Sequence, residues 1–203
     1  MIRNETDTDA LVERARTGDV AARENLLVRH RGRLRRMVAV RMDRRLAARL
    51  DPSDVIQEAL TEAAVRLPDY LEHRPMPFYP WLRQLTWDCL IRLHREHIYR
   101  QKRSVAREED WEAVLADESA RLVADQLLAR PDSPIARLAR REMLERVQAA
   151  MDELDPKDRE ILVLKYLEQL TTEQISAVLG ITPAAVKSRH FRAIQRVHRR
   201  LAP

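Results

Sequence analysis

One segment near the C-terminus, residues 170–201, constrains the fold most, because it carries start and stop signals for two consecutive helices. Thr171 and Gln174 are spaced as a capping box, in which each residue's side chain accepts the other's backbone N–H. Gly180 lies where the chain must turn sharply, since glycine tolerates positive φ. Pro183 suits the first position of the next helix. The segment therefore predicts two short helices joined by a glycine-containing turn.

The apolar and small residues of this segment fit two helices that pack closely together. Leu170 and Ile175 can form a hydrophobic staple around the first helix start, and Ile181 and Val186 can form a second one. Ser176 is small enough to let the two helices approach each other. Two short helices with such a turn form a helix-turn-helix, a motif that binds DNA.

The second of these helices carries small polar and cationic residues at its start and along its outer side. A recognition helix reads base edges mainly with its N-terminal residues, while flanking cations hold phosphates. A plain helical hairpin with a solvated basic face is the alternative, but caps, turn, buried positions and charge together favour DNA binding. The residues expected to contact DNA here are Thr172, Pro183, Ala184, Lys187, Ser188, Arg189 and Arg192.

Composition predicts an all-helical protein with more than one cationic surface. Only 3 of the 203 residues are glycine and 4% are aromatic, whereas strands favour aromatic and β-branched side chains. The net charge is +5, and basic stretches occur at residues 29–49, 92–103 and 187–200. An acidic stretch at residues 108–132 separates the last two. This pattern indicates two DNA-facing surfaces on either side of a connector.

Several classes of protein are disfavoured by what the sequence lacks. A single cysteine, Cys89, provides no disulfide framework and no cysteine metal cluster. The first ten residues have no apolar signal-peptide core, and no apolar run approaches the length of a membrane span. We expect a cytoplasmic protein that is not an enzyme, is not inserted in a membrane, and needs neither cofactor nor metal.

The rest of the chain also predicts helices. Apolar residues recur at helical spacing over residues 9–50, and Asp51-Pro52 predicts the start of a helix that ends near Leu67. The four prolines in residues 68–80 predict a loop, and a third helix follows from Trp81 to Lys102. Beyond the connector, helices are expected over residues 135–151 and, capped by Asp155, from there to about Leu170.

The helix that begins at Asp51 has one polar side. Asp54, Gln57, Glu58 and Thr61 share this side because they lie three or four residues apart. Clustered carboxylates could bind a metal or act as acid and base, but no histidine stands at ligand spacing and the side should be solvated. An exposed polar face is one interpretation; a docking face for a basic partner helix agrees better with the whole chain.

Aromatic and cationic residues alternate in the helix predicted from Trp81. Rings can stack on unpaired bases while cations follow the backbone, a combination typical of proteins that bind melted DNA. Phe78 and Trp81 are better explained as core residues. His94 and His97 have no third ligand that would make a metal site. The residues expected to contact DNA are Arg83, Trp87, Asp88, Arg92 and Arg95.

These segments resemble those of bacterial RNA polymerase sigma factors. DPSDVIQEA resembles the region 2 motif that binds core polymerase, and FYPWLRQLTWDCLIRL is similar to the segment that melts and reads the minus-ten promoter element. LDPKDREILVLKYLEQLTTEQISAVLGITPAAVKSRHFRAIQRV resembles region 4, which reads the minus-thirty-five element. The match follows the family order over almost the whole chain, and the lack of extra domains points to the extracytoplasmic-function class.

The resemblance implies a non-catalytic initiation factor with region 2 in residues 1–103, a linker in residues 104–134 and region 4 in residues 135–203. Its partners would be core RNA polymerase, through the β′ clamp helices and β flap, and promoter DNA, with an anti-sigma factor as a further candidate partner. The segment Leu71–Pro80 would capture a flipped promoter base. The residues implied to bind polymerase are Asp51, Asp54, Gln57 and Glu58.

Two residues depart from the family pattern, and two other functions are compatible with parts of the sequence. Asp88 stands where asparagine is common, and Arg92 where an acidic or polar residue is frequent, so the minus-ten preference should differ. A helix-turn-helix regulator controlled by a ligand or by dimerisation is the first alternative. A helical metal-dependent hydrolase that uses Asp51, Asp54 and Glu58 with a histidine is a remote one.

Overall fold

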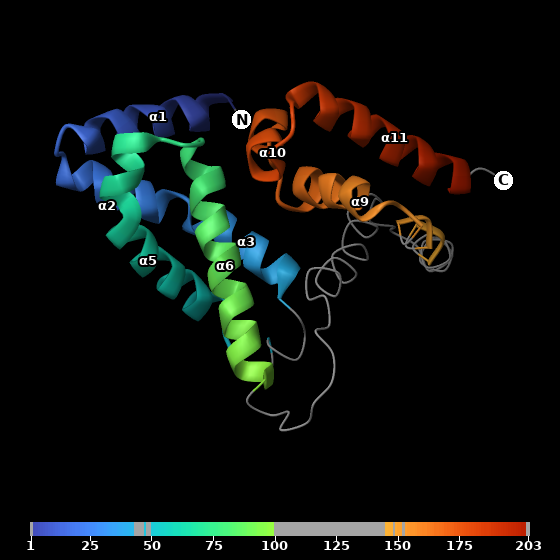
Figure 1. Cartoon of the computed structure of the whole chain (residues 1–203), viewed down its shortest axis with the longest axis horizontal. Coiled ribbons are helices and arrows are strands. Elements are labelled where there is room, and N and C mark those ends of the chain that lie inside the picture. The colour runs from blue at the N-terminus through green and yellow to red at the C-terminus, as the bar shows by residue number, and fades with distance from the viewer. Residues whose placement is uncertain are drawn as a thin grey trace, which may run out of the picture. The chain divides into compact units, whose positions relative to one another are not determined.

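A computed structural model describes residues 2–42, 47, 50–99, 145–147, 149–151 and 153–201. Within these ranges every regular element is a helix, so the all-helical prediction is confirmed (Figure 1). The chain divides into two compact units, Met1–Val105 and Ala106–Pro203. The predicted linker, residues 104–134, and most of the helix predicted over residues 135–151 lie outside the described residues. None of the described helices combines the length and apolar character that a membrane span requires.

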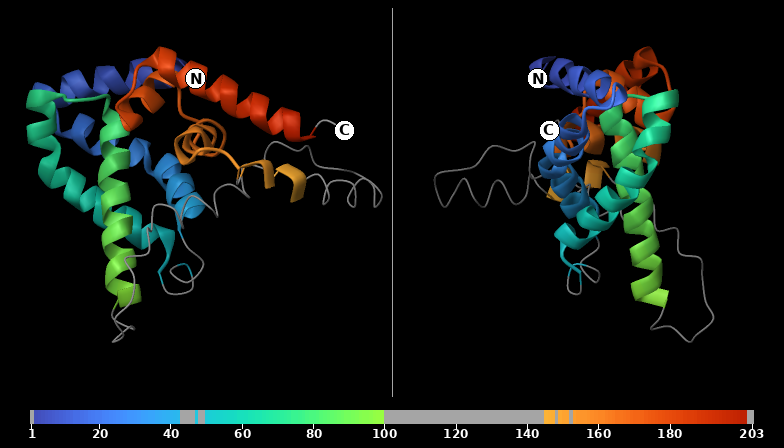
Figure 2. Two further views of the ribbon diagram at one scale, coloured as in Figure 1. Left: turned by 45° about the vertical axis from the view of Figure 1, so that its right-hand side comes forward. Right: turned by 90° about the vertical axis from the view of Figure 1, so that its left-hand side faces the viewer.

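Among the described residues of the first unit, three shorter helices pack against a pair of long ones. α5 and α6, each 22 residues long, contact each other, and α3 packs against both, as the views in Figures 1 and 2 show. The helices are α1 (Ile2–Arg16), α2 (Val20–Arg29), α3 (Arg31–Arg41), α5 (Pro52–His73) and α6 (Phe78–Tyr99). The largest side chains that are fully buried between them are Leu26, Leu34, Met37, Ile56, Leu82 and Leu90. Leu82, Leu85, Cys89 and Leu93, which recur at helical spacing, form the buried stripe of α6.

The loop predicted over residues 68–80 is wrong in extent. α5 continues through Pro68 to His73, because the exposed proline faces solvent while Tyr70 and Leu71 beyond it are buried. Burial of these two side chains offsets the backbone hydrogen bond that proline removes. Arg74 follows as the C-cap of the helix, with a left-handed φ of 42° and an N–H that donates to the Tyr70 carbonyl at 2.8 Å.

Aromatic packing also starts α6 earlier than the sequence predicts. Phe78 and Tyr79 are buried, and the Tyr70 ring stacks on Trp81 with centroids 4.5 Å apart. The Tyr70 hydroxyl donates to the Met76 carbonyl at 3.0 Å and so holds the short connection between the helices. Only residues 74–77 separate α5 from α6, so the predicted base-capturing loop Leu71–Pro80 is helical at both ends.

The second unit contains a helix with a widened last part, followed by a helical hairpin. Asp155 caps α9 (Pro156–Leu162), as predicted, by accepting the Lys157 N–H at 2.9 Å. The chain then widens into the π-helical turn η1 (Val163–Leu167) and does not continue as an α-helix to Leu170. α10 (Thr172–Leu179) and α11 (Pro183–Leu201) complete the unit, and α11, with 19 residues, is longer than expected. Ile161, Leu162, Leu164 and Ile175 are fully buried.

Candidate functional site

The turn between α10 and α11 has the geometry that the sequence predicts. Thr171 accepts the Gln174 N–H at 3.2 Å, and the Gln174 side chain accepts the Thr171 N–H at 3.2 Å, so the capping box is complete. Gly180 ends α10 with φ of 62°, a conformation that other residues adopt at a cost. The Thr182 hydroxyl accepts the Ala185 N–H at 3.2 Å at the start of α11.

Buried side chains fix how the two helices of this hairpin cross. Leu170 and Ile175 are 2% and 0% exposed, and Val186 of α11 is buried as well. The Ser176 hydroxyl donates to the Ile181 carbonyl, which ties the end of α10 to the turn. The N-terminal part of α11 is therefore held by packing and hydrogen bonds while its other side stays accessible.

The accessible side of α11 carries exposed cations from Lys187 to Arg200. The helix contains no acidic residue between Pro183 and Leu201. Among the predicted DNA contacts, Thr172 and Arg189 are half-buried and the following are exposed: Pro183, Ala184, Lys187, Ser188 and Arg192. Sequence reasoning missed Phe191, a residue that is 61% exposed and precedes Arg192 in the sequence. Its place outside the buried stripe of Val186, Ala193 and Val197 was the available signal.

A second feature that the sequence did not predict joins α11 to the widened turn. The Tyr166 hydroxyl and His190 Nε2 lie 3.1 Å apart, and the two residues are 24 positions apart in the chain. Burial, followed by the nearby Lys165 charge, lowers the pKa of His190, so the neutral ring is favoured. This contact braces the middle of α11 against η1.

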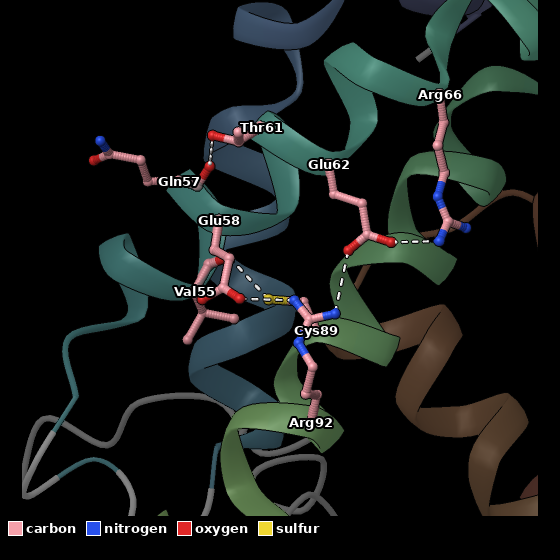
Figure 3. A network of polar contacts seen from close by, with 8 residues as sticks. All are labelled: Val55, Gln57, Glu58, Thr61, Glu62, Arg66, Cys89 and Arg92. Atoms are coloured by element: carbon pink, nitrogen blue, oxygen red, sulfur yellow. Dashed lines mark hydrogen bonds and ion pairs between the residues drawn. The ribbon is translucent and has the colours of Figure 1, made fainter. Parts of the chain in front are cut away.

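In the first unit, the predicted polar side of α5 forms one wall of an open groove of about 520 Å³. Asp54, Gln57 and Glu58 are exposed there, and the Thr61 hydroxyl donates to the Gln57 carbonyl at 2.9 Å (Figure 3). The groove is lined by Asp54, Gln57, Glu58, Thr61, Glu62, Val65 and Arg92. Sequence reasoning missed Glu62 and Val65, although both continue the same helical spacing; Val65 is 78% exposed.

Asp51, the fourth predicted polymerase contact, has a structural task. Its side chain accepts the Ser53 N–H at 2.7 Å and so caps the N-terminus of α5. This backbone hydrogen bond is the main reason why the pKa of Asp51 is below its ordinary value. The residue is exposed, but it is not part of the groove lining.

Arg92 lies in the groove and pairs with two glutamates of α5 (Figure 3). Its guanidinium donates to Glu58 Oε1 at 2.7 Å and to Glu62 Oε2 at 3.4 Å. Glu62 also pairs with Arg66 at 2.7 Å on the same helix. The structure thus brings a predicted DNA contact of α6 together with a predicted polymerase contact of α5.

The other predicted DNA contacts of α6 have different environments. Asp88 and Arg95 are exposed and Trp87 is half-buried, with the Arg41 guanidinium 5.4 Å from its ring centroid. Arg83 is only 5% exposed, which argues against its predicted contact with DNA. Arg83 lies on the buried side of α6, whereas its charge alone suggested an exposed position.

The charge of Asp88 is disfavoured by its surroundings. The pKa of Asp88 is raised mainly by partial burial and then by the nearby Glu62 carboxylate. Arg66 and Arg92 act in the opposite direction and lower it. Phe78, expected in the core, is buried, and Trp81 is half-buried against Tyr70. Within the described ranges, no three His, Cys, Asp or Glu side chains gather closely enough to hold a metal ion.

Comparisons with known proteins agree with this geometry. The family "Sigma-70, region 4" matches residues 144–197, which include α10 and most of α11. The solved structure of CnrH in complex with the cytosolic domain of CnrY has a similar fold, with a TM-score of 0.50, 23% identity and 95% of each chain covered.

Curated relatives extend the similarity to the rest of the chain. The probable RNA polymerase sigma factor RfaY of Xanthomonas campestris is 31% identical over 77% of this chain, which spans 34% of that relative's length. The RNA polymerase sigma-H factor of Pseudomonas aeruginosa is 27% identical over 100% of this chain and 97% of its own. The ECF RNA polymerase sigma-E factor of Haemophilus influenzae is 24% identical over 96% of this chain and 95% of its own length. This chain therefore carries a sigma-70 region 4 over residues 144–197 and is similar over its whole length to RNA polymerase sigma factors, including one of the extracytoplasmic-function (ECF) class.

Proposed function

We propose that the chain is a transcription initiation factor that binds core RNA polymerase, directs it to promoters and helps to melt them. The α5 groove docks on the β′ clamp helices through Asp54, Gln57 and Glu58. The outer side of α6 holds the separated non-template strand, and α11 enters the major groove of upstream duplex DNA near the β flap. Neither unit performs chemistry, which belongs to the polymerase.

One observation carries this proposal: an exposed acidic groove in the first unit accompanies an acid-free cationic helix in the second. An ordinary helix-turn-helix regulator needs the cationic helix but has no use for the groove. Two weak DNA contacts joined in one chain gain effective concentration only where a larger partner fixes their separation. The isolated chain should therefore bind promoters weakly and the holoenzyme tightly.

A regulatory protein partner is part of the same proposal. CnrH was solved in complex with the cytosolic domain of CnrY, which supports binding of this chain by an anti-sigma factor. Such a partner would compete with polymerase or DNA for the surfaces described above.

Promoter-specific transcription with purified core polymerase tests the proposal. The wild type should initiate at defined genomic promoters, and the double variant Gln57→Ala, Glu58→Ala should lose initiation through weaker polymerase binding. The variant Arg189→Ala should weaken upstream DNA contact and leave polymerase affinity unchanged. A wild-type chain that directs no initiation and does not associate with polymerase would contradict the proposal.

A further inference from the structure

A single cation lies among the residues that line the α5 groove. Arg92 reaches into it from α6 and binds Glu58 and Glu62, as Figure 3 shows. All other lining residues are acidic, amide, hydroxyl or apolar. Carboxylates in an open groove attract basic groups of a partner. Arg92 thus occupies the place that such a group would take.

The two glutamates differ in how firmly they are paired. Glu62 has a second cation, Arg66, at 2.7 Å, and its side chain is 21% exposed. Among the ion pairs of the described residues, Glu58 pairs with Arg92 alone, and its side chain is 46% exposed. Exposed ion pairs are weak and exchange readily. Glu58 can therefore change partners while Glu62 stays neutralised by Arg66.

Arg92 also stands at the border of a second surface. Asp88, Arg92 and Arg95 lie at spacings of four and three residues, so they share one side of α6. Asp88 and Arg95 are exposed on that side. A guanidinium on a long side chain can move from the groove to this side by changing rotamers, without movement of the helix. There it would lie beside Arg95, where a backbone phosphate would bind.

We propose that Arg92 is an intramolecular substitute for a basic side chain of the docking partner; this rests on the proposed function of the groove. In the free chain, Arg92 neutralises Glu58. When polymerase docks, a basic side chain of the partner takes Glu58, and Arg92 turns to a phosphate of the non-template strand. Polymerase binding and DNA binding are then coupled, because each favours the same position of Arg92.

The affinity of the full chain for core polymerase, measured by fluorescence anisotropy, tests the first half of the exchange. Arg92→Gln should bind roughly two- to fivefold more tightly than wild type, because Glu58 no longer has a competing partner. Arg16→Gln is the matched control, since Arg16 pairs with Glu13 at 3.2 Å on the exposed surface of α1. It removes the same charge and should leave the affinity unchanged. Equal or weaker binding by Arg92→Gln would overturn the proposal.

A second measurement needs no polymerase, so it separates this inference from the proposed function. Affinity of the free chain for a labelled single-stranded oligonucleotide of mixed sequence is compared for Glu58→Gln, Arg92→Gln and the double variant. Glu58→Gln should strengthen binding more in the wild-type background than in the Arg92→Gln background, because only the wild type has a cation to release. The exposed Glu24→Gln controls for net charge and should give the same small gain in both backgrounds. Equal gains from Glu58→Gln in both backgrounds would overturn the exchange even if polymerase binds normally.

Discussion

The two candidate binding surfaces are built in different ways. In the α10–α11 hairpin, the cap, the staple and the turn all lie within one short segment, and buried side chains hold the helices together. The α5 groove depends on contacts between residues 30 and 34 positions apart, which are exposed ion pairs. The hairpin is therefore specified locally and is sensitive to packing, whereas the groove is specified by tertiary contact and tolerates surface change.

The largest expected effect is in the hairpin core. Ile175→Ala should lower the free energy of unfolding of the second unit by about 2–5 kcal/mol, because Ile175 is fully buried and the cavity would fill only in part. Urea denaturation followed by circular dichroism measures the loss.

Val65→Ala provides the contrast in the groove. Its side chain is 78% exposed, so the same measurement should change by less than about 0.5 kcal/mol. A large loss at Val65, or a small one at Ile175, would remove the proposed distinction between a packed hairpin and a tolerant groove.

Two glycine substitutions should have opposite signs. Gly180→Ala should lower the free energy of unfolding by about 1–2 kcal/mol. A φ of 62° strains any residue that has a Cβ, even though no atom lies within 4 Å of a Cβ placed here. Gly32 lies in the first turn of α3, and a Cβ there would also have no atom within 4 Å. Gly32→Ala should stabilise by about 0.5–1 kcal/mol, since glycine loses more backbone entropy on folding.

Thermal and urea unfolding of both glycine variants, with the wild type, measure these changes. Two changes of equal sign would contradict the view that the turn is set by local backbone conformation.

This contrast explains what the sequence could and could not predict. The capping box at Thr171, the turn at Gly180 and the cap at Asp51 were predictable because each depends on neighbouring residues only. The course of α5 past Pro68 was not, since it depends on burial of Tyr70 against rings of another helix. Likewise, no local signal places Arg92 on Glu58 or buries Arg83, so these side chains were assigned to DNA from charge alone.

A smaller effect should separate two roles of Asp51, the capping of α5 and a charged contact with polymerase. Asp51→Ala removes the α5 cap and should lower the urea midpoint by less than Gly180→Ala does, whereas Asp51→Asn keeps a good capping acceptor. If Asp51 acts on polymerase only by capping, Asp51→Asn should retain the wild-type polymerase affinity. A loss of affinity in a stable Asp51→Asn variant would instead add its charge to the docking surface.

The pKa of Asp51 sets the pH range of this effect. Because the folded chain lowers that pKa, the ionised cap stabilises fully above the ordinary aspartate value of 3.8 and is lost as the pH falls through the lowered value. The stability difference between wild type and Asp51→Ala should therefore shrink only in strongly acidic solution.

The smallest expected change is at Asp88, beside the groove. Asp88→Asn should stabilise the first unit at neutral pH by less than about 0.5 kcal/mol, because solvent screens the Glu62 repulsion at this partly exposed site. The folded chain raises the pKa of Asp88, so the unfavourable charge is present only above that raised value, and the advantage of asparagine should vanish as the pH falls through it. An advantage that persists in acid would point to packing instead. Because the same substitution removes a negative charge next to Arg95, affinity of the free chain for single-stranded DNA should rise, and it should do so even where Arg92 remains bound to Glu58.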